Sequence, residues 1–158
     1  MLKRLTAIAG ALLLVVMLQA ATISPNIKSK TSFAIIIDKA TYTALEDKVA
    51  AYRDAIEADG LATWIVAEEF KSPEAVKAEI LRLRSDKKMP LEGVVFIGDI
   101  PVAMIRDAQH LASAFKMNQE NKWTASSIPS DRFYDDFDLK FDFLKQDENI
   151  PSYFYYSL

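Results

Sequence analysis

The sequence predicts an α/β domain with a mainly parallel sheet and helices on both of its faces. Three observations lead to this expectation. Short, continuous apolar runs rich in β-branched residues begin at positions 32, 61 and 93, and such runs are typical of strands covered on both faces. Between them lie two segments with the apolar period of a helix. The order strand–helix–strand–helix–strand, with crossovers long enough for right-handed βαβ units, favours parallel strands.

The composition agrees with a globular protein and excludes several kinds of site. Of the 158 residues, 51% are apolar and 26% are charged, which argues against intrinsic disorder. The chain has no cysteine and one histidine. A disulfide scaffold, a thiolate metal centre, a cysteine nucleophile and a multi-histidine metal site are therefore excluded within it. The net charge of −3 gives no support for a nucleic-acid partner.

Residues 1–21 have the features of a secretory signal peptide. Two basic residues, Lys3 and Arg4, precede an apolar run that ends at Leu18, and two small residues follow. The run of about 14 residues is shorter than the roughly 20 that cross a bilayer as a helix. We expect an exported protein, periplasmic, on the cell surface or extracellular, with no membrane span after signal cleavage. An uncleaved N-terminal anchor is the alternative.

The first strand and helix are predicted after a polar lead-in at residues 22–31. The strand is Ser32–Asp38. Thr43 and Glu46 have the spacing of a capping box and predict the start of the helix, and Gly60 predicts its end. Its apolar stripe is expected to consist of Leu45, Val49, Tyr52 and Ile56.

The second helix lies between two further predicted strands. The first of these is Leu61–Val66. Ser72, followed by a proline, is typical of a helix start. The stripe of this helix is expected to be Val76, Ile80 and Leu83. The next strand is Gly93–Ile97, and a Gly-Asp pair follows it.

After Asp99 the pattern predicts an irregular C-terminal part. Residues 100–104 fit either an extension of the strand or a turn at Pro101. Asp107–Met117 predicts a short helix, and a polar loop is expected at 118–127.

The end of the chain is rich in aromatic residues. Phe137–Phe143 alternates apolar and charged residues and predicts a half-buried strand or one arm of a β-hairpin. The final segment, 152–158, is expected to be buried structure rather than a ligand site, because exposed aromatic clusters are a liability. We expect residues 32–158 to form a single α/β domain that is incomplete at its C-terminus.

Acidic residues follow each of the three predicted parallel strands. In an open parallel sheet, ligands bind outside the carboxyl ends of the strands. The residues expected there are Asp38, Glu68, Glu69 and Asp99. They could bind a divalent cation or act as acid and base, or they could cap the helices that follow. No glycine-rich nucleotide-binding motif of either standard kind is present.

A second acidic segment lies near residue 130. Its carboxylates could bind calcium, a hard ion that prefers oxygen ligands, and they are Asp131, Asp135, Asp136 and Asp138. The segment lacks the mid-loop glycine of an EF-hand and also fits a solvated acidic turn that enters a strand. His110 fits a surface or partly packed residue better than a catalyst, because no nucleophile motif accompanies it.

Two segments, VVFIGDIP at Val94–Pro101 and IPSDRFYDDFD at Ile128–Asp138, resemble the gingipain-type cysteine peptidases. These peptidases are bacterial, secreted and caspase-like in fold. The predicted order of elements before the first segment agrees, so that the resemblance covers roughly residues 32–143. It implies a caspase-like fold and peptide-bond hydrolysis by a His–Cys dyad, often with stabilising calcium.

The chain lacks the residues that this activity needs. In the family, the His-Gly segment and the cysteine follow the region of resemblance. This chain has no cysteine, and His110 precedes the acidic segment and has no glycine after it, so we do not assign the dyad histidine to it.

Three hypotheses follow. The first is the N-terminal portion of an exported peptidase, inactive as this chain, with a peptide or protein substrate bound through the missing part. The second is a non-enzymatic exported binding module on a flavodoxin-like sheet, with calcium as a candidate ligand. The third is a small-molecule domain that uses Asp38 and Asp99.

Overall fold

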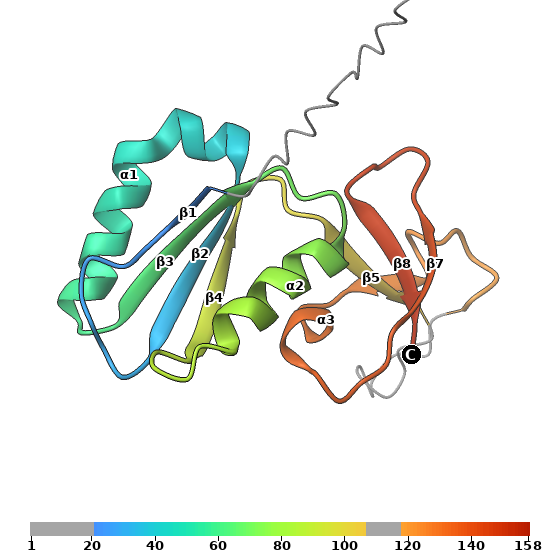
Figure 1. Cartoon of the computed structure of the whole chain (residues 1–158). Coiled ribbons are helices and arrows are strands. Elements are labelled where there is room, and N and C mark those ends of the chain that lie inside the picture. Colours follow the sequence, from blue (N-terminus) through green and yellow to red (C-terminus); the bar gives the residue numbers. More distant parts are fainter. Residues whose placement is uncertain (1–20, 107–117) are drawn as a thin grey trace, which may run out of the picture.

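The computed structural model describes residues 21–106 and 118–158, which form two four-stranded sheets and three helices (Figure 1). The first sheet has the order β1-β3-β2-β4 and contains β1 (Ala21–Ile23), β2 (Ser32–Asp38), β3 (Ala62–Glu68) and β4 (Leu91–Ile97). The second has the order β6-β5-β8-β7 and contains β5 (Val102–Arg106), β6 (Ser127–Pro129), β7 (Asp142–Gln146) and β8 (Tyr153–Ser157). The helices are α1 (Lys39–Ala58), α2 (Pro73–Arg84) and α3 (Arg132–Asp135).

Both sheets are mixed, so the prediction of a mainly parallel sheet is met only in part. β2 lies between β3 and β4 and is parallel to both. β1 comes from the start of the expected polar lead-in and pairs antiparallel with β3. The chain leaves this sheet after β4, because Pro101 and the turn before it direct β5 into the second sheet. The expected signal peptide falls on residues 1–20, outside the described residues, except for Ala21 in β1.

The two faces of β2 are buried by different helices. Ile35 and Ile37 pack in one apolar cluster with Val49 of α1. Ala34 and Ile36 pack in another cluster, which contains the stripe of α2. These four side chains of β2 are 0% exposed, which explains why the strand is apolar at consecutive positions between Ser32 and Asp38 rather than at every second one.

The capping residue predicted for α1 is wrong. The helix begins at Lys39, and Asp38 is its N-cap, because the Asp38 carboxylate accepts the backbone N–H of Thr41 at 2.9 Å. The hydroxyl of Thr43 instead donates to the carbonyl of Lys39, at 2.8 Å, inside the first turn. The aspartate that ends β2 therefore caps α1, five residues before the expected cap.

The predicted stripe of α1 is also wrong in part, whereas that of α2 is confirmed. Leu45 has non-helical dihedral angles (φ −127°, ψ 19°) at a kink and is 45% exposed, and Tyr52 is 43% exposed. In α2, Ser72 accepts the N–H of Ala75 at 3.3 Å as the predicted cap. The three predicted core residues are buried: Val76, Ile80 and Leu83.

The aromatic end of the chain forms the strand β8 near the centre of the second sheet. It is parallel to β5 and antiparallel to β7, so β7 and β8 form the hairpin. Phe154, Tyr155 and Tyr156 are buried, as predicted for this segment. The other arm was predicted as a half-buried strand at residues 137–143, but it lies at Asp142–Gln146 and is exposed throughout. The helix expected at 107–117, with His110, lies outside the described residues.

The two sheets share one apolar cluster beneath α2. Phe133, Phe154 and Tyr156 from the second half of the chain pack in the cluster that contains Ala34 and Ile36. The hydroxyl of Tyr156 also donates to the carboxylate of Glu74 on α2, at 2.7 Å. The second sheet is thus held against α2 by both apolar packing and a hydrogen bond.

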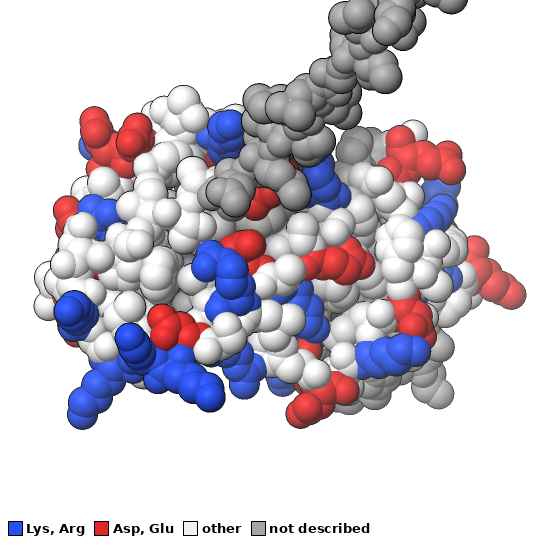
Figure 2. Space-filling view, in the orientation of Figure 1, with Lys and Arg blue, Asp and Glu red and all other residues white. Residues whose placement is uncertain are grey.

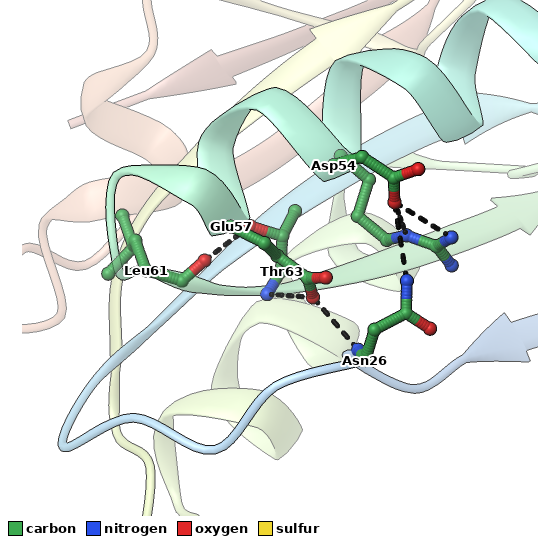
Figure 3. Close-up of polar contacts among 6 residues, drawn as sticks. Asn26, Asp54, Glu57, Leu61 and Thr63 are labelled. Carbon is green, nitrogen blue, oxygen red and sulfur yellow. Dashed lines mark hydrogen bonds and ion pairs between the residues drawn. The ribbon is translucent and has the colours of Figure 1, made fainter.

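A buried carboxylate joins the end of α1 to the lead-in and to β3 (Figure 3). Glu57 is 7% exposed, and its Oε1 accepts the backbone N–H groups of Asn26, at 2.9 Å, and Thr63, at 3.2 Å. The hydroxyl of Thr63 donates to the carbonyl of Leu61 at 2.8 Å. The side chain of Asn26 donates to Asp54 at 3.2 Å, closer to the surface. The carboxylate satisfies donors that the sheet and helix leave unpaired.

Candidate functional site

The described residues form a cleft at the carboxyl ends of β2 and β4. The crossover after β2 leads to β3 on one side, and the next crossover leads to β4 on the other side of β2. Ligands of open α/β sheets bind at such a change of direction. The cleft has a volume of about 790 Å³ and lies between this edge of the first sheet and the β7–β8 hairpin.

The turn after β4 is built against the cap of α1. Gly98 has φ +84°, a left-handed conformation that favours glycine. The next backbone N–H, of Asp99, donates to Oδ2 of Asp38 at 3.0 Å. A Cβ at position 98 would lie 1.7 Å from that oxygen, so the approach of the two segments requires glycine. Asp38 therefore caps α1 and also links the ends of β2 and β4. This agrees with the alternative, left open by the sequence, that the acidic residues after the strands cap the helices that follow.

The pKa of the Asp38 carboxyl is lowered by this arrangement. Burial acts to raise the pKa, but hydrogen bonds from Thr41, Asp99 and Ala40 outweigh it because they stabilise the charged form. The carboxylate is held in its ionised form by the Thr41 side chain and the surrounding backbone N–H groups rather than poised for proton transfer at neutral pH.

This lowered pKa predicts a loss of stability in acid. The contribution of Asp38 is fully present above the pKa of an unfolded aspartate, near 3.9, and is lost as the pH falls through the lower folded-state pKa. We expect Asp38→Asn to be less stable than the wild-type chain at pH 6, and the difference to shrink below about pH 4. Urea unfolding followed by circular dichroism from pH 6 to pH 2 measures it. A difference that stays constant down to pH 2 would contradict this role of the carboxylate.

The cleft has an apolar floor and a charged rim. Phe70, Pro101 and Phe154 are buried and line it, the last of them from β8. The rim contains the polar side chains of Lys39, Glu69, Lys71, Asp99, Gln146 and Ser152. Lys71 forms an ion pair with Glu69, and both side chains are exposed. Such a rim offers positive and negative groups to one ligand, above a floor that buries its apolar part.

Three of the four acidic residues predicted for this edge line the cleft. They are Asp38, Glu69 and Asp99, brought together by the parallel strands as expected. Glu68 lies at the end of β3 away from the lining, and burial, with the negative charge of Glu79, raises its pKa. Two parts of the cleft were not predicted from the sequence: the lysines of the rim, Lys39 and Lys71, and the wall from the second sheet. Each lysine lies within two positions, in the sequence, of an acidic residue predicted for this edge. That proximity is the sequence feature that could have placed the lysines at the site.

The acidic segment near residue 130 does not gather into a ligand cage. Oδ1 of Asp136 accepts the backbone N–H groups of Asp138 and Leu139, each at 3.0 Å, and so closes a turn. Asp135 lies 3.8 Å from Arg132. Over residues 21–106 and 118–158, no group of three or more acidic or histidine side chains could hold a metal ion. Calcium binding by Asp131, Asp135, Asp136 and Asp138 stays a prediction.

The two segments that resemble the gingipain-type peptidases lie against each other. The hydroxyl of Tyr134 donates to the carbonyl of Pro101, and its ring packs edge-on against Phe96, with 4.9 Å between ring centres. The N–H of Ser130 donates to the carbonyl of Ala103 at 3.0 Å. Burial, with the charges of Asp131 and Glu74, raises the pKa of Tyr134, so its hydroxyl remains a donor at neutral pH. The two segments thus form one structural unit.

No protein-family model, curated protein or solved structure matches the chain. Among the described residues, no helix has the length and apolar character to cross a bilayer. The cleft, as described, is lined by neither histidine nor cysteine. Its side chains can bind a ligand through charge, hydrogen bonds and apolar contact, but they do not include the thiol–imidazole pair of a cysteine peptidase.

Proposed function

We propose that this chain is a non-catalytic, peptide-binding portion of an exported gingipain-like peptidase. The observation that carries the proposal is the cleft at the carboxyl ends of β2 and β4, with its apolar floor and its rim of both charges. A peptide carries the matching groups, because its side chains are apolar or charged and its backbone donates and accepts hydrogen bonds. The cleft binds such a ligand and leaves its chemistry to a dyad that this chain does not contain.

The affiliation with the peptidases is supported by the contact between the two resembling segments. Phe96 and Pro101 belong to the first, Tyr134 belongs to the second, and these three residues touch although more than thirty positions separate the segments' interacting residues. The three parallel strands β2, β3 and β4, with the Gly98 turn after the last, agree with a caspase-like arrangement. The reading frame that encodes the chain tests this part: an apolar strand ending in His-Gly and a later one ending in Cys should follow Leu158.

Peptide binding is tested with the lysines of the rim. Fluorescent peptides of mixed charge and sequence are titrated against the purified chain, and binding is followed by anisotropy. We expect Lys39→Ala/Lys71→Ala to weaken binding by about fivefold or more, because two exposed rim charges are removed. The control is Lys87→Ala/Lys88→Ala, which removes two exposed lysines outside the cleft and should leave binding unchanged.

Two results would contradict peptide binding in the cleft. One is equal affinity of the cleft variant and the control variant for the same peptide. The other is the absence of binding to any peptide at millimolar concentration. A failure of the reading-frame test with intact peptide binding would instead leave an independent binding module, the second hypothesis from the sequence.

A further inference from the structure

The strand β4 has an unpaired edge with few charged residues. Within the described residues it pairs with β2 on one side and with no strand on the other. Its centre, Gly93–Ile97, contains five consecutive residues without a charge. Each of these is partly exposed, whereas the facing residues Ala34, Ile35 and Ile36 of β2 are 0% exposed. The difference arises because β4 lacks a neighbour on its outer side.

The other three sheet edges carry the usual protection against pairing. β1 and β6 are each three residues long, and β6 ends in Pro129. β7 is exposed throughout and carries Asp142 and Lys145. Natural edge strands avoid unwanted pairing by being short, charged or interrupted by proline. β4 has seven residues and none of these devices in its centre, so its edge is suited to pairing.

A groove runs along β4 beside this edge. Its volume is about 890 Å³, and its lining includes Ile80 of α2, Tyr134 of α3, and Phe137, all of them apolar or aromatic. None of its lining residues lines the cleft at the carboxyl ends of the strands, so the two are separate. The face that carries α2 shows side chains of both charges around these elements (Figure 2).

The charges that line the groove are mainly negative. They are the carboxylates of Glu92, Asp131 and Asp135 and the guanidinium of Arg84. Arg84 is stacked on the ring of Phe137, at 4.1 Å from its centre. Asp135 has Arg132 nearby, whereas the exposed carboxylates of Glu92 and Asp131 have no hydrogen bond or ion pair with the described residues. The groove therefore offers an apolar wall and two unpaired negative charges.

The wall opposite β4 is fixed to α2. Nζ of Lys77 donates to the carbonyl of Asp136 at 3.0 Å. The same ammonium lies over the rings of Phe133, Phe137 and Phe141, at 5.1 to 5.5 Å from their centres. These cation–π contacts and the hydrogen bond hold the segment after α3 in place. A segment that enters the groove meets a wall that is already formed.

We propose that the free edge of β4 binds an extended, cationic peptide segment by strand addition. The backbone of the segment pairs with the unpaired groups of β4, and its side chains toward α2 contact the apolar wall. A Lys or Arg side chain beside Glu92 or Asp131 supplies a positive charge to carboxylates that have no ion pair with the described residues. A second copy of this chain fits less well, because it brings the same carboxylates and presents β4 beside its own α2 and α3.

The experiment uses the peptide acetyl-Lys-Val-Thr-Val-Thr-Val-Lys-amide and the full chain. We expect binding by calorimetry, and protection of the backbone amides of β4 in hydrogen exchange. N-methylation of the peptide at one set of alternate residues should abolish binding, and at the other set leave it intact, because an added strand uses one of its edges. A peptide with glutamate in place of both lysines should bind at least tenfold more weakly.

Protein variants separate this groove from other surfaces. Glu92→Lys/Asp131→Lys should weaken binding of the cationic peptide at least tenfold, whereas Glu46→Lys/Asp47→Lys, the same charge change on the exposed face of α1, should leave it unchanged. Lys39→Ala/Lys71→Ala, in the cleft, should also leave binding of the cationic peptide unchanged. A negative result for the β4 groove can therefore be told apart from a negative result for peptide binding in the cleft. Tolerance of both N-methylated peptides, absence of binding at millimolar concentration, or amide protection that follows dimerisation would each overturn the proposal.

Discussion

Gly98→Ala is expected to destabilise the chain by about 2–4 kcal/mol. Part of this cost is conformational, because alanine is strained at φ +84°. The rest arises because the new Cβ would lie 1.7 Å from Oδ2 of Asp38 and 2.7 Å from Oγ1 of Thr41, and must displace the carboxylate that caps α1. Urea unfolding of the variant and the wild-type chain measures the difference.

A second glycine separates the two contributions. Gly60, at the end of α1, has φ +91° but nothing within 4 Å of the position of a Cβ, so Gly60→Ala should cost only about 1–2 kcal/mol. In the double variant Asp38→Ala/Gly98→Ala the collision with the Asp38 carboxylate is removed, and the loss should be smaller than the sum of the single losses by about 1–2 kcal/mol. Equal losses for the two glycine variants, or strict additivity in the double variant, would show that Asp38 and Gly98 do not constrain each other.

Glu57→Ala is expected to cost about 2–4 kcal/mol, because the buried carboxylate accepts two backbone N–H groups and leaves both unpaired when removed. The amide of Thr63 belongs to a residue that is 0% exposed and has no route to water. Glu57→Gln keeps an acceptor oxygen at the same place and should cost less than half as much. Urea unfolding and hydrogen exchange at the amide of Thr63 measure both effects.

The neighbouring carboxylate provides a matched control. Asp54 lies on the same helix, and its side chain is 60% exposed beside Arg53. Because the Asp54 carboxylate is largely exposed and water screens its ion pair with Arg53, Asp54→Ala should change the stability by less than about 0.5–1 kcal/mol. A similar loss in the Asp54 and Glu57 variants would mean that burial of the Glu57 contacts does not matter.

The elements that could be predicted are those whose signal is local. β2 has a continuous apolar run between Ser32 and Asp38 because helices cover both of its faces, and α2 begins with a serine cap, Ser72, followed by a proline. The start of α1 was misplaced because two capping residues compete within the sequence. Asp38 prevails over Thr43, because its carboxylate also accepts the N–H of Asp99 from a distant turn.

The division into two sheets could not be predicted from local patterns. The alternation at residues 137–143 predicts a strand, but Phe137 and Phe141 instead pack sideways on the core beneath α2, where Lys77 lies over their rings. Pairing of β5 with β8 joins segments from distant parts of the sequence. No property of either segment alone specifies that partner.

The part of the candidate site that could be predicted is the part formed by the ends of the parallel strands. Asp38 and Asp99 were placed together because parallel strands bring their carboxyl ends to one edge. The far wall of the cleft, with Phe154 and Ser152, comes from the second sheet and was therefore missed. The role of the rim lysines, Lys39 and Lys71, depends on the same wall and has no signal of its own in the sequence beyond their proximity to the acidic residues.

The parallel pairing of β5 with β8 has a consequence for the order of events during synthesis. Val102 lies beside Tyr153, and β8 is the strand that joins β5 to β7. Contacts between residues so far apart in sequence form slowly, since a long loop must close first. The first sheet can assemble while the chain is still emerging from the ribosome, but the second must wait until β8 has been made. Until then α2 is covered only by the first sheet, because Phe154 and Tyr156 of β8 complete the apolar cluster beneath it.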